Sequence, residues 1–360
     1  NIDYTGPQFV YNKNGITNIS DCMVQIAQNE SSTNPQEFCE ANRLNISGSV
    51  EVYSSATSDA VLWFTGSNAS LTVEENSEFI VSASLTYLCY TDVSPVMLFK
   101  RGSSTTITTQ KGLFYAAGSG SHIAASFTVE QKASFVAHRT GSNSVPMLKC
   151  VSNLTIDSGA IFQLYSTASS AALIYFGQVA NITFNSPQSV ILYDSGANVF
   201  SFQTGNASTP NTMSITTEML RLWDTATTPL SSAGGLDDIP TSEYHKLEYA
   251  QNLSLTIQNS NSQLLTCTSN IEEGDTGYPL TTATLNILKS RVISLGEISL
   301  TVDPITDISS EIQGITEGAA SVSVKYDTVS NTTAAELNGR FLVAIEQPIA
   351  VNTIVQITAN

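Results

Sequence analysis

The sequence contains few charged residues and very few basic ones. Charged residues make up 12% of the 360 residues, and 14 Lys and Arg stand against 31 Asp and Glu, which gives a formal net charge of −17. An acidic chain whose basic residues cluster on no periodic face is repelled by phosphate backbones, so we expect no nucleic-acid partner. The polar surface must instead be built from Ser, Thr, Asn and Gln.

Long apolar runs and a leader segment are also missing. No apolar stretch approaches the roughly 20 residues that a membrane-spanning helix needs, and the sequence starts at Asn1 without a signal-peptide pattern. We therefore expect a mature or excised extracellular fragment with no membrane-inserted segment.

Cysteine is scarce and forms no recognisable cluster. The five residues are widely spaced, with no CxxC pair and no zinc-finger spacing, and they are Cys22, Cys39, Cys89, Cys150 and Cys267. Their odd number argues against a complete disulfide framework. A Cys22–Cys39 bridge remains open, but free buried thiols that act as small apolar residues are favoured.

What the sequence does contain is an internal repeat. A tetrad of an apolar residue, Thr, a second apolar residue and then Asp, Glu or Asn recurs in steps of 27 or 28 residues, or of 56 where one copy is skipped. The copies are Leu71–Glu74, Phe127–Glu130, Leu154–Asp157 and Ile182–Asn185, with Leu44–Ser47 as a degenerate first copy. A fixed period of this length is typical of solenoid proteins.

Two further kinds of apolar run keep the same period. One comprises Val61–Phe64, Val96–Phe99, Ile123–Ala125, Val145–Leu148, Leu173–Phe176 and Val199–Phe202, and the other Phe79–Val81, Phe135–Ala137, Phe162–Leu164 and Val190–Leu192. Three short strands per repeat, rich in β-branched and aromatic residues, predict the coils of a right-handed parallel β-helix. Stacking should align the inward residues Val73, Val129, Ile156 and Phe184 in one ladder and point the tetrad threonines outward.

Two segments depart from this rhythm. Ser82–Pro95 adds extra residues between apolar runs and is predicted to be an excursion loop. Ile19–Gln28 carries apolar residues at helical spacing after the possible N-caps Ser20 and Asp21, which predicts a short amphipathic capping helix. Residues 1–43 would thus cover the first coil, because an open solenoid end is prone to aggregate.

After Phe202 the repeat becomes less regular. The predicted elements in the rest of the chain indicate the domain organisation. Met213–Trp223 and Leu253–Ile257 are predicted strands, residues 224–250 a long loop, and the final strands are expected at Leu264–Cys267, Leu285–Leu288 and Val292–Leu295. We therefore predict an all-β protein with a β-helix over residues 1–298. Residues 299–360, with seven short alternating strands, should form a C-terminal β-sandwich.

Both parts resemble known domains. Ile305–Ser309, Ile312–Thr316, Gly318–Val322 and the turn Asn338–Phe341 resemble the bacterial Ig-like domains that are repeated in Gram-positive surface adhesins. Ile182–Val190, with the preceding tetrads and the following Trp223, resembles the pectate-lyase-like adhesive domain of such proteins. That resemblance spans Ile19–Leu295, although the N-terminal segment departs from the family pattern. It implies a β-helical adhesive tip on a stalk of Ig-like repeats at the cell wall.

No catalytic residues are predicted. Lyases that share this fold use a calcium ion held by several carboxylates, and hydrolases use paired carboxylates. The tetrad carboxylates Glu74, Glu130 and Asp157 are instead spread along the stack. His122 and His138 lack a partner in a nucleophile motif, so neither is assigned a catalytic role.

The best local cluster for a ligand lies in the long loop. It combines an acidic pair with aromatic and imidazole groups, and its members are Trp223, Asp237, Asp238, Tyr244 and His245. Such a loop could hold a metal, with Ca²⁺ as the candidate, or a sugar stacked on Trp223. The alternative is a solvated acidic loop with Trp223 as packing. Trp63, within an apolar run, is predicted to be core.

The leading functional hypothesis is a monomeric, non-catalytic cell-surface adhesin that needs no cofactor. It would bind host or neighbouring-cell glycans or proteins through many weak polar contacts outside the cell. Two alternatives stay open. One is a polysaccharide lyase or glycoside hydrolase whose residues converge only in the fold, and the other is a passive structural spacer.

Overall fold

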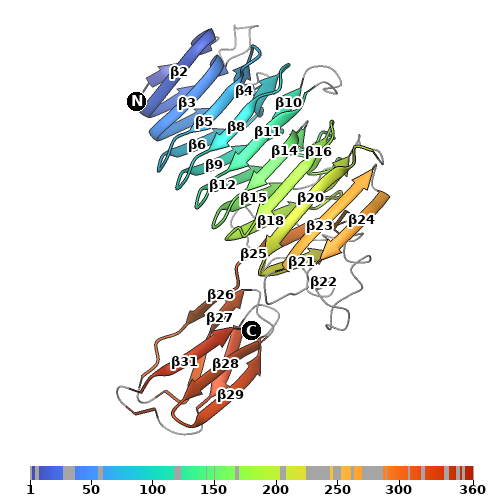
Figure 1. Cartoon of the computed structure of the whole chain (residues 1–360). Helices are drawn as coiled ribbons and strands as arrows, with labels where there is room; N and C mark the ends of the chain where they lie inside the picture. The colour runs from blue at the N-terminus through green and yellow to red at the C-terminus, as the bar shows by residue number, and fades with distance from the viewer. Residues whose placement is uncertain are drawn as a thin grey trace.

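The computed structural model is all-β and forms a β-solenoid of about six turns (Figure 1). The residues that the structure describes are 2–4, 8–26, 37–55, 60–116, 123–142, 144–149, 151–166, 170–202, 208–223, 244–245, 253–260, 263–269, 287–288, 290–306, 309–317, 321–335, 340–345, 349–350 and 353–359. The predicted β-helical architecture is therefore confirmed at this level.

Three ladders of parallel strands run along the solenoid, and we refer to them as faces A, B and C. All three start from the long strand β3 (Glu37–Ser54), which pairs on its other side with β2 (Gln8–Ile26) and through it with β1 (Ile2–Tyr4). Face A contains β5 (Ser70–Val73), β8 (Val96–Phe99), β11 (Ala125–Val129), β14 (Val151–Ile156), β17 (Asn181–Asn185) and β20 (Asn211–Thr217).

The other two faces complete each turn. Face B contains β6 (Glu78–Ala83), β9 (Ser104–Thr109), β12 (Ser134–Arg139), β15 (Ile161–Ser166) and β18 (Ser189–Asp194). Face C contains β4 (Ala60–Phe64), β7 (Tyr87–Thr91), β10 (Gly112–Ala116), β13 (Leu148–Lys149), β16 (Ile174–Phe176) and β19 (Phe200–Phe202). The backbone N–H of Leu113 donates to the carbonyl of Met147, which joins the two parts of face C.

The core consists of residues that repeat at the same inward position in successive turns. The predicted ladder Val73, Val129, Ile156 and Phe184 is confirmed, with Phe99 of the skipped copy between the first two, and all five side chains are fully buried. Strand alternation produces this arrangement, because each ladder side chain is flanked by outward ones. The predicted threonines Thr72, Thr128, Thr155 and Thr183 accordingly point outward and are partly exposed.

The corner between faces A and B repeats one backbone conformation. One residue per turn has a positive φ, and these residues are Asp21, Gly48, Asn76, Gly102, Lys132, Gly159 and Ser186. Left-handed backbone is unstrained for glycine and tolerated by Asn and Asp. A tight corner thus requires one such residue in every turn, whatever its side chain.

Several local predictions were wrong. Ile19–Ile26 belongs to β2 and not to a capping helix, because pairing with β3 satisfies its backbone groups; residues 27–28 lie outside the described part. Ser82–Pro95 is not an excursion loop, since it contains the end of β6 and all of β7. Val96–Phe99 and Ala125 belong to face A, and face C in those turns is formed by β7 and β10.

Antiparallel strands close the C-terminal end of the solenoid. On face A, β20 is followed by β23 (Leu253–Ser260) and β24 (Gln263–Ser269), and on face B, β25 (Val292–Gly296) pairs with both β18 and β21 (Met219–Trp223). Ile287 and Leu288 are helical, so the strand predicted at Leu285–Leu288 is not formed there. Of the predicted long loop, the structure describes β22 (Tyr244–His245).

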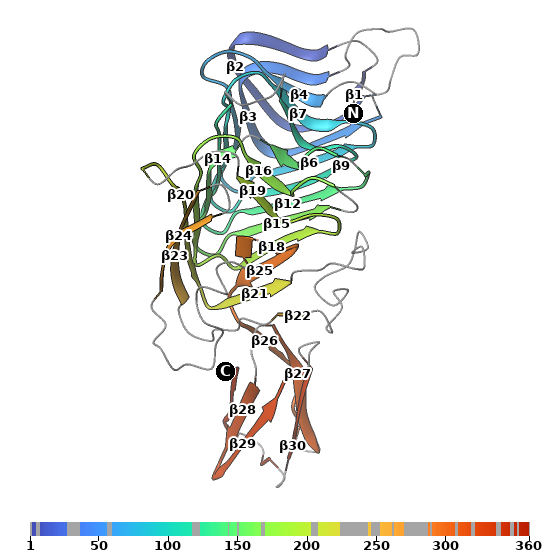
Figure 2. The same cartoon turned by 90° about the vertical axis from the view of Figure 1, so that its right-hand side faces the viewer.

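The C-terminal module consists of two three-stranded antiparallel sheets (Figure 2). One contains β26 (Ser299–Val302), β27 (Glu311–Glu317) and β30 (Arg340–Ala344), and the other β28 (Ser321–Tyr326), β29 (Val329–Ala334) and β31 (Val355–Ala359). A separate apolar core, which includes Ile312, Val324, Tyr326 and Phe341, stabilises it. Seven strands were predicted, and the described residues form six.

Candidate functional site

The predicted loop site is placed in part by backbone pairing. Strand β22 pairs antiparallel with β21, so that Tyr244 lies opposite Trp223 and His245 opposite Leu222. Three of the five predicted residues therefore come together in the sheet. Asp237 and Asp238 lie outside the described residues, and the predicted acidic cluster stays a prediction.

Face A carries a regular array of uncharged polar side chains over its last six strands. We refer to the outward residues of β11, β14, β17, β20, β23 and β24 as the hydroxyl–amide face. One row consists of Ser126, Asn153, Asn181, Thr212, Gln258 and Thr266, and the other of Thr128, Thr155, Thr183, Ser214, Thr256 and Thr268. None of the twelve side chains is buried, and neighbouring members of a row are about 4.8 Å apart, the spacing of paired strands.

Hydrogen bonds between neighbouring strands hold part of this array in place. Asn181 donates from Nδ2 to Asn153 Oδ1 at 3.3 Å and accepts at Oδ1 from the Thr212 hydroxyl at 2.8 Å. The Thr266 hydroxyl donates to Gln258 Oε1 at 3.3 Å. Side chains that are ordered in this way lose less conformational entropy when a ligand binds, so the face is preorganised for polar contacts.

A cluster of aromatic and charged side chains lies on the outward side of the first turns of face C. We refer to Tyr11, Lys13, Glu40, Trp63 and Tyr90 as the Trp63 cluster. Tyr11, Glu40, Trp63 and Tyr90 follow one another in register through β2, β3, β4 and β7. The Trp63 and Tyr90 rings pack edge to face with centroids 5.2 Å apart.

An ion pair occupies the centre of the Trp63 cluster. Lys13 Nζ is 2.8 Å from Glu40 Oε1, and it lies 5.3 Å from the Tyr11 ring centroid and 5.9 Å from that of Trp63. The hydrogen bond to Glu40, supported by Tyr11, raises the pKa of Lys13. The Glu40 side chain is 1% exposed whereas that of Lys13 is 44% exposed, so Glu40 fixes a lysine whose outer side remains accessible.

Trp63 is not the core residue that the sequence predicts, and the cluster around it is not among the predicted site residues. Leu62 and Phe64 point inward and are buried, whereas Trp63 between them points outward and is partly exposed. An available signal was the recurrence of an aromatic residue at positions 63, 90 and 115. These positions are Cα partners in successive turns, as the pairing of Tyr115 with Tyr90 shows.

Face B carries a second, more buried aromatic row. The His138 and Tyr165 rings stack with centroids 4.6 Å apart, and the Tyr165 hydroxyl donates to Gln163 Oε1 at 3.1 Å. Burial lowers the pKa of His138. Because this imidazole is half-buried and stacked, packing explains its environment. His122 lies outside the described residues.

The cysteines behave as small apolar residues where they are described. Cys22, Cys39 and Cys89 are free thiols, so the Cys22–Cys39 bridge is not formed. Burial, with smaller contributions from Glu37 and Glu40, raises the pKa of Cys39 to about 12. The pKa of Cys89 is also well above its usual value because of burial. Thiols with such pKa values are poor nucleophiles near neutral pH.

The tetrad carboxylates Glu74, Glu130 and Asp157 lie in one row at the edge of face A. Lys100 lies between Glu74 and Glu130 in this row, and its Nζ is 2.6 Å from Glu74 Oε2. Burial, and then the neighbouring Glu130, raises the pKa of Asp157. Within the described ranges, no three Asp, Glu, His or Cys side chains are grouped as metal ligands would be. Among those same residues no helix is long and apolar enough to cross a membrane.

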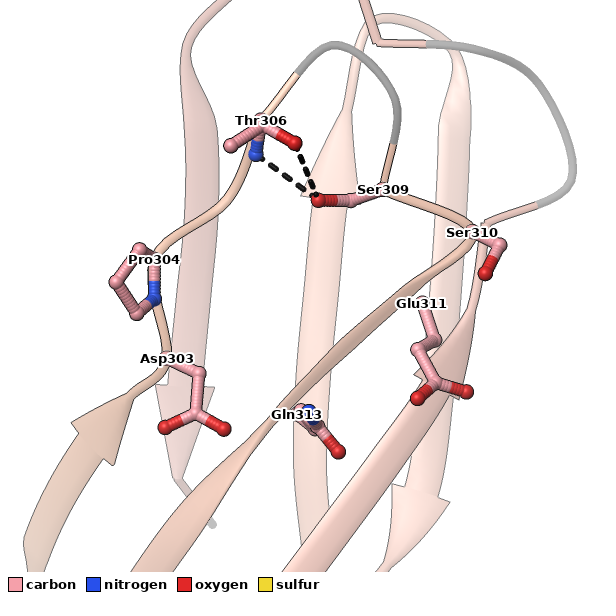
Figure 3. A pocket seen from close by; sticks show the side chains of 7 residues that line it. All are labelled: Asp303, Pro304, Thr306, Ser309, Ser310, Glu311 and Gln313. Carbon is pink, nitrogen blue, oxygen red and sulfur yellow. Dashed lines mark hydrogen bonds between the residues drawn. The ribbon is translucent and has the colours of Figure 1, made fainter.

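The C-terminal module has a polar hollow of about 290 Å³ beside β27 (Figure 3). The Thr306 backbone N–H donates to Ser309 Oγ at 2.9 Å and shapes one wall. Two carboxylates are among its lining residues, which are Asp303, Pro304, Thr306, Ser309, Ser310, Glu311 and Gln313. The lining offers no aromatic platform, and it supports no assignment of a ligand.

No protein-family model, curated protein or solved structure matches the chain.

Proposed function

We propose that the chain is a non-catalytic cell-surface adhesin that binds host or neighbouring-cell glycans or proteins outside the cell. The hydroxyl–amide face is the observation that carries this proposal. It presents twelve uncharged donors and acceptors in two straight rows. Hydroxyls and amides of this kind match the groups of glycans and of polar protein surfaces.

The energetics favour a repetitive ligand. One neutral hydrogen bond contributes about 0.5–1.5 kcal/mol net, so a single contact on this face binds weakly. Several contacts that form together along the rows raise the overall affinity, because each later contact is intramolecular. A polymer that repeats along its length suits a surface that repeats along its axis.

The C-terminal module fits the same proposal. We infer that it is an Ig-like domain of the stalk that carries the adhesive solenoid at a Gram-positive cell wall. Its two antiparallel sheets with their own core support this inference, as does the resemblance of Ile312–Thr316 and its neighbours to such domains.

The test is binding of the whole chain to an array of glycans and extracellular matrix proteins. Thr155→Lys places a long charged side chain on β14, the second of the six strands of the hydroxyl–amide face, and we expect it to weaken binding at least tenfold. Thr106→Lys adds the same charge on face B, where Thr106 is also outward and exposed, and is expected to bind normally. No binding by the folded chain would favour a structural spacer, and cleavage of an arrayed glycan would favour an enzyme.

A further inference from the structure

We propose that the Trp63 cluster is a binding site for neutral pyranose sugars. This inference rests on the proposed adhesive function and assigns it a sugar class and a location. The cluster lies on face C, away from the hydroxyl–amide face. It combines the two features that sugar recognition needs, which are flat apolar surfaces and a fixed polar group that can reach hydroxyls.

The aromatic residues provide the flat surfaces. Tyr11 is 61% exposed, which is the largest exposed fraction among the exposed tyrosines of the described residues. Trp63 lies two turns further along the same row and is partly exposed, although its Nε1 is buried. The Tyr90 ring packs against it edge to face. Aromatic faces stack well against the C–H-rich face of a pyranose because both are apolar and flat. Two platforms separated by two turns would bind two or more sugar units of one chain.

The ion pair provides the polar group. An ammonium has three donors, and Lys13 Nζ is paired with the buried Glu40 carboxylate, 2.8 Å from its Oε1. The outer side of Lys13 remains accessible between the Tyr11 and Trp63 rings. A sugar stacked on either ring would place its hydroxyls within reach of Lys13 Nζ. Glu40 is a positioning residue, because its side chain is almost completely buried.

Charge selects against acidic sugars. Glu40 already neutralises Lys13, so the cluster has no unpaired positive charge for a carboxylate or sulfate. The chain as a whole carries a formal charge of −17, which repels anionic ligands at longer range. Neutral hexoses and N-acetylhexosamines remain as the matching class.

Two tryptophan variants locate the site directly. The chain has two tryptophans, so Trp223→Phe leaves Trp63 as the sole tryptophan reporter and Trp63→Phe leaves Trp223. We would titrate each variant with cellotetraose, chitotetraose, maltotetraose and lacto-N-neotetraose, with sialyllactose as the acidic comparison. We expect a saturable fluorescence shift with at least one neutral oligosaccharide in Trp223→Phe, and none with sialyllactose.

A matched pair of tyrosine variants tests the role of the platform. Tyr11→Ala is expected to weaken binding of the responding oligosaccharide at least tenfold. Tyr53→Ala, which removes an exposed tyrosine on another face, should change it less than twofold. Lys13→Met should weaken binding several-fold with the fold retained, as circular dichroism would show.

The outcomes separate this inference from the proposed function. Glycan binding that is lost in Thr155→Lys but unchanged in Tyr11→Ala would overturn the Trp63 site and leave the adhesin. A fluorescence shift seen only in Trp63→Phe, where Trp223 is the sole tryptophan, would place the sugar site at β21 and β22 instead. The absence of binding to any arrayed glycan or protein would overturn both.

Discussion

Arg139 and Asp194 form a buried ion pair inside the solenoid, where charged side chains are expensive. Both side chains are completely buried, and Arg139 Nη2 is 3.7 Å from Asp194 Oδ2. Arg139 also donates to Ser166 Oγ and to the Val145 carbonyl, and Asp194 Oδ1 accepts from the backbone N–H groups of Gly196 and Ala197. These bonds satisfy most, but not all, of the polar atoms of the pair.

Burial affects the pKa of Asp194 more strongly than these hydrogen bonds do. Desolvation raises the pKa of Asp194 to about 6, even though the Gly196 and Ala197 amides and Arg139 favour the carboxylate. The folded pKa thus lies above the ordinary value of 3.8, and the folded protein binds this proton more tightly than the unfolded chain. The stabilisation from Asp194 is complete below about pH 4 and is lost as the pH rises through 6.

We therefore predict how Asp194→Asn changes the pH dependence of stability. Near pH 4, where Asp194 is protonated, the variant and the natural protein should have similar free energies of unfolding. Between pH 4 and pH 7 the variant should become more stable relative to the natural protein. The gap between 3.8 and about 6 corresponds to at most roughly 3 kcal/mol. Urea denaturation at several pH values measures the difference. If the variant instead loses relative stability as the pH rises, attraction to Arg139 exceeds the desolvation cost.

At the scale of elements, the left-handed corner between faces A and B is the feature that every turn shares. Gly102, Lys132 and Gly159 occupy this corner in three successive turns, with φ of 70°, 59° and 68°. A side chain in this conformation costs about 1–2 kcal/mol, part of which is offset by the greater flexibility of glycine in the unfolded chain. Lys132 thus carries strain that its two neighbours avoid.

Exchanging residues at this corner should change stability in opposite directions. Gly102→Ala is expected to lower the free energy of unfolding by about 1–2 kcal/mol, because the added Cβ also meets Asn76 Oδ1 at 2.5 Å. Lys132→Gly should raise it by up to about 1 kcal/mol. Urea denaturation of both variants, with Lys132→Ala as a control that keeps the strain, measures the effect. Equal stabilities of Gly102→Ala and the natural protein would contradict this account.

The elements that were predicted and those that were missed differ in their inward residues. Tetrad strands such as β14 and β17 place large apolar side chains inward, and these side chains recur in the sequence with a regular period. Strand β9 places Thr105 and Thr109 inward next to Ile107, so it lacks an apolar run. β-sheet pairing with β6 and β12 nevertheless holds it in the ladder, because register follows neighbours as well as hydrophobicity.

At the scale of the whole molecule, the solenoid is a stack in which each turn contacts its neighbours. Phe135 is central to the stack, with ring centroids 4.7 Å from Phe99, 4.9 Å from Phe127 and 5.7 Å from Phe162. The C-terminal module has a separate core. In a stack of this kind, stability is close to a sum of turn and interface contributions.

Loss of the Phe135 ring should therefore destabilise mainly the turns next to it. We expect Phe135→Ala to cost about 3–5 kcal/mol and to speed amide hydrogen exchange most in β9, β12 and β15. Exchange in β28 of the C-terminal module should be unchanged. Val136→Ala, on the outward side of the same strand, serves as the control. A uniform increase across both cores would show that solenoid and module unfold together.

The all-β class, the solenoid period and the inward and outward positions of the tetrads follow from the amino-acid sequence alone. Strand alternation and coil stacking require the same residue types to recur every 27 or 28 residues. The same alternation places Thr128, Thr155 and Thr183 on the outside. Tertiary structure alone decided how the ends are paired and which distant residues meet. Glu40 and Trp63 become neighbours of Lys13 only through coil stacking. Asp194 acquires its raised pKa only because the fold buries it beside Arg139.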